Sequence, residues 1–347
     1  MSCRATAVLI AAMIYISPAS ARAQELGTGA GPGLSLAGAA QGLWQQVQAD
    51  PGRGVDGVER FRARRVHLYF YGQPSDQVNF SFTLAYNDGR EMTIGVYEAW
   101  IRVRLTDWWA VKAGSFLPPW TIEMPKPVHE LDFIRYPLIV DSGLPVMTPW
   151  RQTGLLADFQ IGGNLAVAAG LFAGLDREGE YQDNNNMKDT MIAVSFQAYP
   201  GLILHFGHWG GKSVQEIPVP GLGSSSLEYL NTLVGFEAEH KQWRLSGEAL
   251  WNQVDSRGGT LRKTFGYHLS TVYTRDKIQG LLRYEFLDPE TSDRRNGVDD
   301  EMEWTTIGIN YLPLPAVKLM GAYIFKSERG DNQAANEELL LQISLSF

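Results

Sequence analysis

The chain ends in the segment Glu337-Glu338-Leu339-Leu340-Leu341-Gln342-Ile343-Ser344-Leu345-Ser346-Phe347, where apolar and polar residues alternate. Side chains of a β-strand point alternately to its two faces. One face of this strand is entirely apolar and consists of Leu339, Leu341, Ile343, Leu345 and Phe347. A closed sheet of such strands turns apolar side chains to lipid and polar side chains to a watery lumen. The segment therefore predicts a transmembrane antiparallel β-barrel.

The two ends of the chain indicate export. The terminal Phe347 resembles the export signal of bacterial outer-membrane barrels, whose last strand commonly ends on such a residue. At the other end, a short basic start precedes the apolar run Ala5–Ile16, and Ala21-Arg22-Ala23 fits an A-x-A cleavage site. This pattern predicts a signal peptide over residues 1–23, which is too short to span a membrane, and a mature barrel over 24–347. Cys3, the only cysteine, leaves with it, so no disulfide or thiolate chemistry is expected.

Charge and composition exclude several classes of protein. The 30 basic and 38 acidic residues give a formal charge of −8. Loss of Arg4 and Arg22 leaves 28 basic residues and a charge of −10. Such an acidic balance argues against nucleic acid as a partner. No later apolar run reaches the roughly 20 residues of a membrane helix, so helical spans are excluded, and no cofactor is implied.

The rest of the chain repeats the alternation. Period-two runs between turn residues predict about sixteen strands. They cover roughly 34–48, 61–71, 78–87, 94–105, 109–117, 152–160, 164–173, 187–198, 202–210, 228–240, 243–253, 262–273, 277–287, 301–311, 316–327 and 337–347. Short links such as 241–242 alternate with longer polar ones such as 211–227. Outer-membrane barrels show this pattern, with short periplasmic turns and longer outer loops.

One long link stands apart because of its prolines. Between Leu117 and Arg151 there are seven: Pro118, Pro119, Pro125, Pro127, Pro137, Pro145 and Pro149. Proline lacks a backbone donor, so this link cannot form two more strands, and its apolar content argues against disorder. We expect the link, at about 117–151, to fold into the barrel mouth and narrow it. An ordered loop packed over the rim or against a neighbouring subunit stays open as an alternative.

Several segments together resemble the phosphate-selective porin O and P family of Gram-negative outer membranes. They are Arg64–Gly72, with its paired arginines before a closing glycine, Gly114–Glu123, Arg151–Gly154, Gly170–Gly174 and Asn310–Leu312. Ser115 and Leu117 stand where the family has Gln and Lys, and Ala173 where Asn is usual. The resemblance implies a sixteen-stranded trimeric channel. It does not carry phosphate selectivity over to this chain.

Turning the more apolar face of each strand outward predicts the residues of the lumen. Arg65 and His67 would point inward from 61–71, Arg102 and Arg104 from 94–105, and Lys112 from 109–117. Tyr97 would face lipid. With Lys126 of the proline-rich link, these cations form the predicted anion-binding wall of the pore. Residues of mixed sign lie further along the chain, and they would either weaken selectivity or pair and brace the wall: Asp158, Glu237, Glu239, Arg244, Glu248, Arg283, Glu285 and Lys318.

The sequence contains little that supports a catalytic function. His268 and Ser270 share one strand face, as in an outer-membrane phospholipase, but we expect them to face the lumen and see no orienting carboxylate beside them. No nucleophile elbow, phosphate loop or zinc motif occurs. The chain is therefore predicted not to be an enzyme. A structural barrel with a plugged lumen is the other rival hypothesis.

The sequence thus predicts an outer-membrane porin, a homotrimer through which small hydrophilic solutes, and anions such as phosphate in particular, diffuse passively. A general or weakly selective diffusion porin is the alternative. Outer-membrane lipid and lipopolysaccharide are the expected surroundings. Two acidic stretches would either bridge divalent cations to lipopolysaccharide or remain solvated, and they contain Asp176, Glu178, Glu180, Asp183, Asp299 and Asp300.

Overall fold

The computed structural model describes most of the expected mature chain. Its residues are 24–25, 33–50, 56–87, 94–141, 148, 150–174, 187–219, 223–256, 261–291, 301–328 and 336–347. The expected signal peptide and both acidic stretches lie outside this set. Those three expectations therefore stay predictions.

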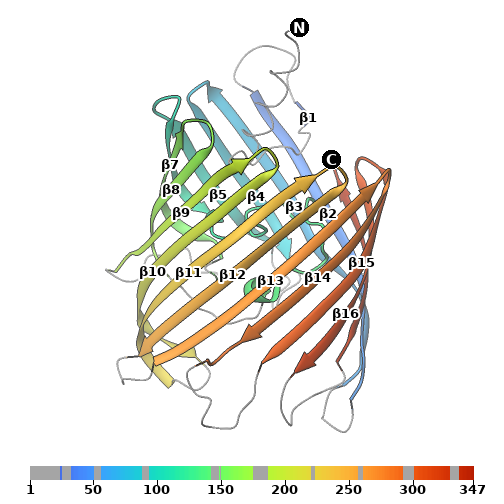
Figure 1. The fold of residues 1–347 in the computed structure, drawn as a ribbon. Coiled ribbons are helices and arrows are strands. Elements are labelled where there is room, and N and C mark those ends of the chain that lie inside the picture. The colour runs from blue at the N-terminus through green and yellow to red at the C-terminus, as the bar shows by residue number, and fades with distance from the viewer. Residues whose placement is uncertain are drawn as a thin grey trace.

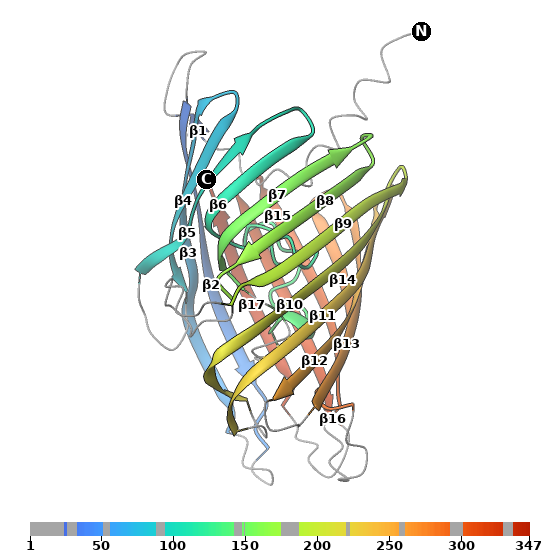
Figure 2. The same ribbon diagram turned by 90° about the vertical axis from the view of Figure 1, so that its left-hand side faces the viewer.

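Sixteen long strands of the described chain close into one antiparallel barrel (Figures 1 and 2). They are β2 (Gly33–Val47), β3 (Val58–Ser75), β4 (Val78–Asn87), β5 (Ile94–Arg104), β6 (Trp109–Phe116), β7 (Gln152–Ile161), β8 (Leu165–Phe172), β9 (Asp189–Tyr199), β10 (Leu202–Val219), β11 (Gly223–His240), β12 (Trp243–Ser256), β13 (Leu261–Arg275), β14 (Ile278–Asp288), β15 (Met302–Leu314), β16 (Val317–Glu328) and β17 (Glu338–Ser346). Each strand pairs with its neighbours in the sequence, and β17 pairs with β2 to close the sheet. The two-residue β1 (Gln24–Glu25) pairs with β2 beyond that seam. The predicted sixteen-stranded barrel is confirmed.

The alternation of side chains runs opposite to that of a soluble protein. On β15, Ile307 and Ile309 are 51% and 57% exposed, whereas Thr306 and Asn310 are 3% and 0% exposed. Polar side chains thus face the interior and branched apolar ones face outward. A charge placed on the outer surface at mid-membrane depth costs about 2–4 kcal/mol, which fixes which face of each strand turns inward.

One predicted outer link is mostly strand. We expected a link over 211–227, but β10 and β11 extend to Val219 and from Gly223, so only 220–222 separate them. The pairs Ile217↔Ser225 and Val219↔Gly223 continue the ladder after a register shift. Serine and glycine in this stretch indicated a loop, but backbone hydrogen bonds hold two strands together whatever their side chains are.

The proline-rich segment between β6 and β7 runs inside the barrel, where it includes the single turn α2 (Leu138–Asp141) (Figures 1 and 2). Its apolar side chains Trp120, Met124 and Ile139 are buried in one cluster with the inward-facing Leu233 and Leu250. No helix of the described chain is long and apolar enough to cross a membrane.

Candidate functional site

The interior segment, residues 117–141, is attached to one side of the barrel, the far wall, which we define as β11–β17. Glu248 of β12 accepts a hydrogen bond from the Ile122 N–H at 2.7 Å, and Glu285 of β14 accepts one from the Leu138 N–H at 2.6 Å. Arg283 donates to the carbonyl oxygens of Arg135 and Tyr136 at 3.0 and 3.2 Å. The far wall therefore satisfies backbone groups that a segment without regular structure cannot pair by itself.

The same attachment continues toward the short-turn end of the barrel. Lys318 donates to the carbonyl oxygens of His129 and Leu131, both at 3.1 Å. Arg244 donates to Asp132 at 2.7 Å. The interior segment thus supplies Arg244 with a carboxylate that no strand pattern reveals.

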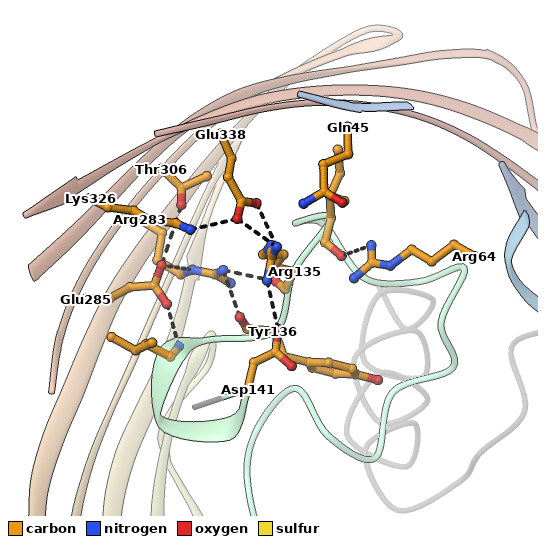
Figure 3. A network of polar contacts seen from close by, with 12 residues as sticks. Gln45, Arg64, Arg135, Tyr136, Asp141, Arg283, Glu285, Thr306, Lys326 and Glu338 are labelled. Carbon is orange, nitrogen blue, oxygen red and sulfur yellow. Dashed lines mark hydrogen bonds and ion pairs between the residues drawn. The ribbon is translucent and has the colours of Figure 1, made fainter. Parts of the chain in front are cut away.

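Most cations of the far wall contact carboxylates, as the network in Figure 3 illustrates. Glu338 accepts hydrogen bonds from Arg135 of the interior segment and from Lys326 of β16, both at 2.7 Å. Arg283 lies 3.2 Å from Glu285 and 3.6 Å from Glu123. Positive charge on this side of the lumen is therefore neutralised locally.

The opposite side, the near wall, consists of β3–β6 and carries arginines at a β-bulge. Gln41 pairs with Arg65 and Gly42 with Ala63, so Arg64 has no partner across the ladder. A bulge of this kind turns two successive side chains to one face. Arg64 donates to the Ile134 carbonyl and to Gln342, and Arg65 lies 5.3 Å from the centre of the Tyr136 ring. Both arginines thus face the interior segment, although simple alternation had turned only Arg65 inward.

A second bulge corrects the orientation expected for Tyr97. Thr83 pairs with Glu98 and Leu84 with Val96, which leaves Tyr97 unpaired in the ladder. Its ring lies 4.8 Å from that of His67, and the Arg151 guanidinium lies over it at 3.8 Å. Tyr97 therefore faces the lumen beside Glu98 and not lipid, because the extra residue shifts the alternation by one.

The predicted pore residues on β5 and in the interior segment have partners that alter how much positive charge they present to the lumen. Arg102 forms an ion pair with Asp158 at 3.2 Å, and Lys126 lies 3.7 Å from Glu237. Arg104 is exposed and donates to the Asp76 carbonyl in the β3–β4 turn at 2.8 Å. It stands at the end of the barrel, so the structure does not bring Arg104 together with the other predicted cations beside the interior segment.

His67 and Lys112 are placed among aromatic rings. His67 Nδ1 lies 3.1 Å from Tyr69 Oη. Lys112 Nζ lies 4.2 Å from the centres of both the Trp100 and the Phe116 rings. A cation over a ring face is stabilised without losing its charge.

Four near-wall cations contact only neutral groups within the described chain. Arg60 donates to Gln45, Arg64 to a carbonyl and an amide oxygen, and Arg65 and Lys112 lie over rings. Arg60 and Arg64 were not among the predicted site residues. The alternation of Arg60, Arg62 and Arg64 with Phe61 and Ala63 is the sequence signal that could have indicated them.

Burial shifts the pKa of titratable groups in the interior segment. Burial raises the pKa of Glu123, against the opposing effect of Arg283. Burial also lowers the pKa of His129, which Glu130 partly offsets, and raises that of the Tyr136 phenol. Tyr136 therefore stays neutral, so the ring beneath Arg65 brings no negative charge to it.

The described strands contain two Ser–His–Glu arrangements. Ser270 Oγ lies 3.2 Å from His268 Nδ1, and His268 Nε2 lies 3.1 Å from Glu248. The expectation that no carboxylate orients His268 is therefore wrong. All three side chains are buried beneath the interior segment, and Glu248 also binds the Ile122 N–H. This trio anchors the segment and leaves no space for a substrate at Ser270.

The second arrangement, Ser195–His205–Glu237, was not anticipated. Ser195 Oγ and Glu237 Oε1 each lie 3.0 Å from a ring nitrogen of His205. Ser195 and His205 are paired across the β9–β10 ladder, and their neighbouring backbone groups belong to that ladder. Acyl transfer needs backbone or side-chain donors aimed at a developing oxyanion, and ladder N–H groups point along the sheet instead. The geometry favours a hydrogen-bonded wall over a nucleophile.

Comparisons with known proteins identify relatives of this barrel. The family model for phosphate-selective porin O and P matches residues 39–220, more than half of the chain. No match was found among the curated proteins.

Solved structures of similar fold include porins and other outer-membrane proteins. An anion-selective porin from Comamonas acidovorans is 13% identical with a TM-score of 0.70, over 91% of this chain and 100% of that chain. OmpF of Salmonella typhi, in complex with daunomycin, is 11% identical with a TM-score of 0.70, over 93% and 100%. The channel DcaP of Acinetobacter baumannii is 12% identical with a TM-score of 0.65, over 92% and 99%. At sequence identities this low, the matches show a shared fold alone.

Proposed function

The chain belongs to the phosphate-selective porin O and P family, and from this premise we infer that its outer-membrane channel passes small hydrophilic solutes by diffusion, with a preference for anions such as phosphate. The observation that carries the preference is the near wall. Among the described residues, its cations Arg60, Arg64, Arg65 and Lys112 make direct contacts only with neutral groups.

The location of these cations matters more than the charge of the whole chain. Arg64 and Arg65 contact Ile134 and Tyr136 of the interior segment, so they lie where that segment occupies part of the lumen. Fields between charges are screened over about 8 Å at physiological salt. Distant carboxylates therefore contribute little to the electric potential beside the interior segment. A few local cations set the ionic preference, despite the acidic balance of the chain.

A general or weakly selective diffusion porin is the second candidate. It is favoured by a cavity of about 470 Å³ between the interior segment and the far wall. Carboxylates of the interior segment and of β11 line it: Glu123, Glu130, Asp132, Glu237 and Glu239. If solutes pass mainly by this side, mixed charges would leave little net selectivity.

We further propose that the porin is a homotrimer in lipid and lipopolysaccharide. The resemblance to its family supports this assembly, as does the trimer form of OmpT from Vibrio cholerae among the solved structures of similar fold. Cross-linking of the protein extracted in mild detergent tests it, and a monomer under those conditions would contradict it.

The double substitution Arg64→Gln/Arg65→Gln tests the anion preference. In planar bilayers under a KCl gradient, we expect the reversal potential to move clearly toward cation preference with little change in pore size. The matched control is Arg275→Gln/Lys277→Gln, which removes two positive charges at the β13–β14 hairpin and should leave the potential in place. An unmoved potential in the first variant would leave the general diffusion pore as the better description.

A further inference from the structure

The near wall, the interior segment and residues of β7–β12 line a second cavity of about 300 Å³, which contains several aromatic rings. This volume lies at the lower end of the roughly 300–1,000 Å³ typical of small-molecule sites. Seven Phe, Tyr and Trp residues line it: Tyr69, Tyr71, Tyr97, Trp100, Trp120, Tyr136 and Phe206. A passage needed only for small inorganic ions has no use for so much flat apolar surface.

Two of the rings lie nearly parallel to each other. Tyr69 and Tyr71 share the inner face of β3, and their rings lie 6.2 Å apart at an interplanar angle of 10°. Parallel rings in one row offer stacking faces to a planar solute, and aromatic pairs contribute about 0.5–1.5 kcal/mol beyond their buried area.

One of the cations that line the cavity forms no direct ion pair within the described residues. Three lysines and arginines line it, and two of them form ion pairs, Arg102 with Asp158 and Lys126 with Glu237. Lys112 contacts only the Trp100 and Phe116 rings within the described chain. Its ammonium group has three N–H donors, and rings do not satisfy them as oxygen acceptors do. A carboxylate can.

Acidic groups around the cavity limit the charge of the ligand. Glu98 lines it, with its carboxylate held by the Trp100 indole N–H at 3.1 Å, and Glu130 lines it as well. Two carboxylates beside a single available ammonium disfavour a dianion, because like charges in a partly dehydrated lumen repel strongly. The site fits one negative charge attached to a flat ring.

We propose that this cavity is a binding subsite for monoanionic aromatic carboxylates, in which the carboxylate binds Lys112 and the ring stacks along Tyr71 and Tyr69. The subsite rests on the proposed porin function and names a solute class for it. Such solutes bind weakly and reversibly during passage, since a permeating ligand must also be released.

The test uses the full barrel in planar bilayers, with benzoate as the probe and chloride as the current carrier. Benzoate should reduce the conductance in a saturable way. Cyclohexanecarboxylate has the same charge and similar size but no planar ring, so it should need about three to ten times the concentration, a ratio that corresponds to the stacking contribution. Acetate and phosphate should give no saturable reduction.

Two substitutions locate the effect. Lys112→Gln removes the ammonium, and Tyr71→Leu removes a ring while it retains apolar volume. Each should raise the half-blocking concentration of benzoate at least threefold, whereas Lys277→Gln at a distant hairpin should leave it unchanged. Equal block by benzoate and cyclohexanecarboxylate in the wild-type channel would overturn the inference even if a variant failed to fold. So would a benzoate block that Lys112→Gln leaves intact. Failure of the proposed function shows separately, as cation preference in plain KCl.

Discussion

The near and far walls of the lumen carry cations of the same kinds in opposite electrostatic states. On the far wall, Arg283 and Lys326 contact carboxylates at 3.2 and 2.7 Å. On the near wall, the contacts of Arg65 and Lys112 with the described part of the chain are with aromatic rings alone. A count of inward charges would treat the two walls alike. The partner of each cation, and not its presence in the lumen, decides whether it holds the interior segment or acts on solutes.

The difference has a structural origin in residues 117–141. This segment needs acceptors and donors for backbone groups that prolines leave without regular pairing, and the far wall supplies them through Glu248, Glu285 and Arg283. Carboxylates used for that purpose then hold neighbouring cations as well. The near wall contributes fewer such contacts, so its charges stay available.

The largest expected effect follows from removal of the interior segment. Deletion of about residues 121–147 should raise single-channel conductance severalfold, because a sixteen-stranded barrel without internal chain encloses a wide aqueous channel. The anion preference should fall at the same time, since ions could pass far from Arg64 and Arg65. Conductance recordings check both. Unchanged conductance in a folded trimer would mean that the segment does not limit flow.

The next effect concerns stability and separates the walls directly. Arg283→Met leaves Glu123 and Glu285 buried without their cation, which costs about 3–5 kcal/mol when one partner of a buried pair is removed. Arg65→Gln removes a near-wall cation that contacts no carboxylate among the residues that the structure describes, and it should change stability by no more than about 0.5 kcal/mol. Urea unfolding of the refolded barrel in detergent measures both. Similar losses would contradict the division into a structural and a functional wall.

A smaller effect tests Arg102, a near-wall arginine that forms an ion pair. Arg102→Ala leaves the Asp158 carboxylate exposed to the lumen and should move the reversal potential modestly toward cations. Arg102→Ala/Asp158→Ala removes a pair of zero net charge and should restore the wild-type potential. If the double variant shifts as far as the single one, the pairing of Arg102 with Asp158 does not cancel its field.

The smallest effect is a dependence of stability on pH. Burial holds the pKa of His129 below its ordinary value of about 6.5, so the unfolded chain binds more protons between the two values. Stability then rises with pH through that window and falls on acidification from about pH 7. Unfolding curves at several pH values should show a weaker dependence for His129→Gln than for wild type. If stability depends on pH as steeply in His129→Gln as in the wild type, His129 is not the source of that dependence.

Alternation predicted most of the fold because every lumen-facing position in a barrel must tolerate water and every outer position must tolerate lipid. It located sixteen strands, with β10 and β11 the clearest errors of boundary. It failed at Arg64 and Tyr97, since a bulge adds one residue without any change in composition.

The side-chain partners of the lumen residues were harder to predict than the positions of those residues on the strands. Arg244 binds Asp132, which lies more than a hundred residues away in a segment with no periodic pattern. The register that places Glu248 opposite His268 also depends on pairing that single strands do not reveal. The sequence therefore indicated which residues enter the lumen better than which of them keep an available charge.

The reversal potential of the wild-type channel under a KCl gradient tests the central claim most directly. If the available charges of Arg60, Arg64, Arg65 and Lys112 govern passage, chloride permeates faster than potassium, although the mature chain is expected to carry a net charge of −10. The preference should weaken as salt rises from 0.1 to 1 M, because the screening length falls from about 10 to about 3 Å. A wild-type channel that prefers potassium at low salt would contradict the account.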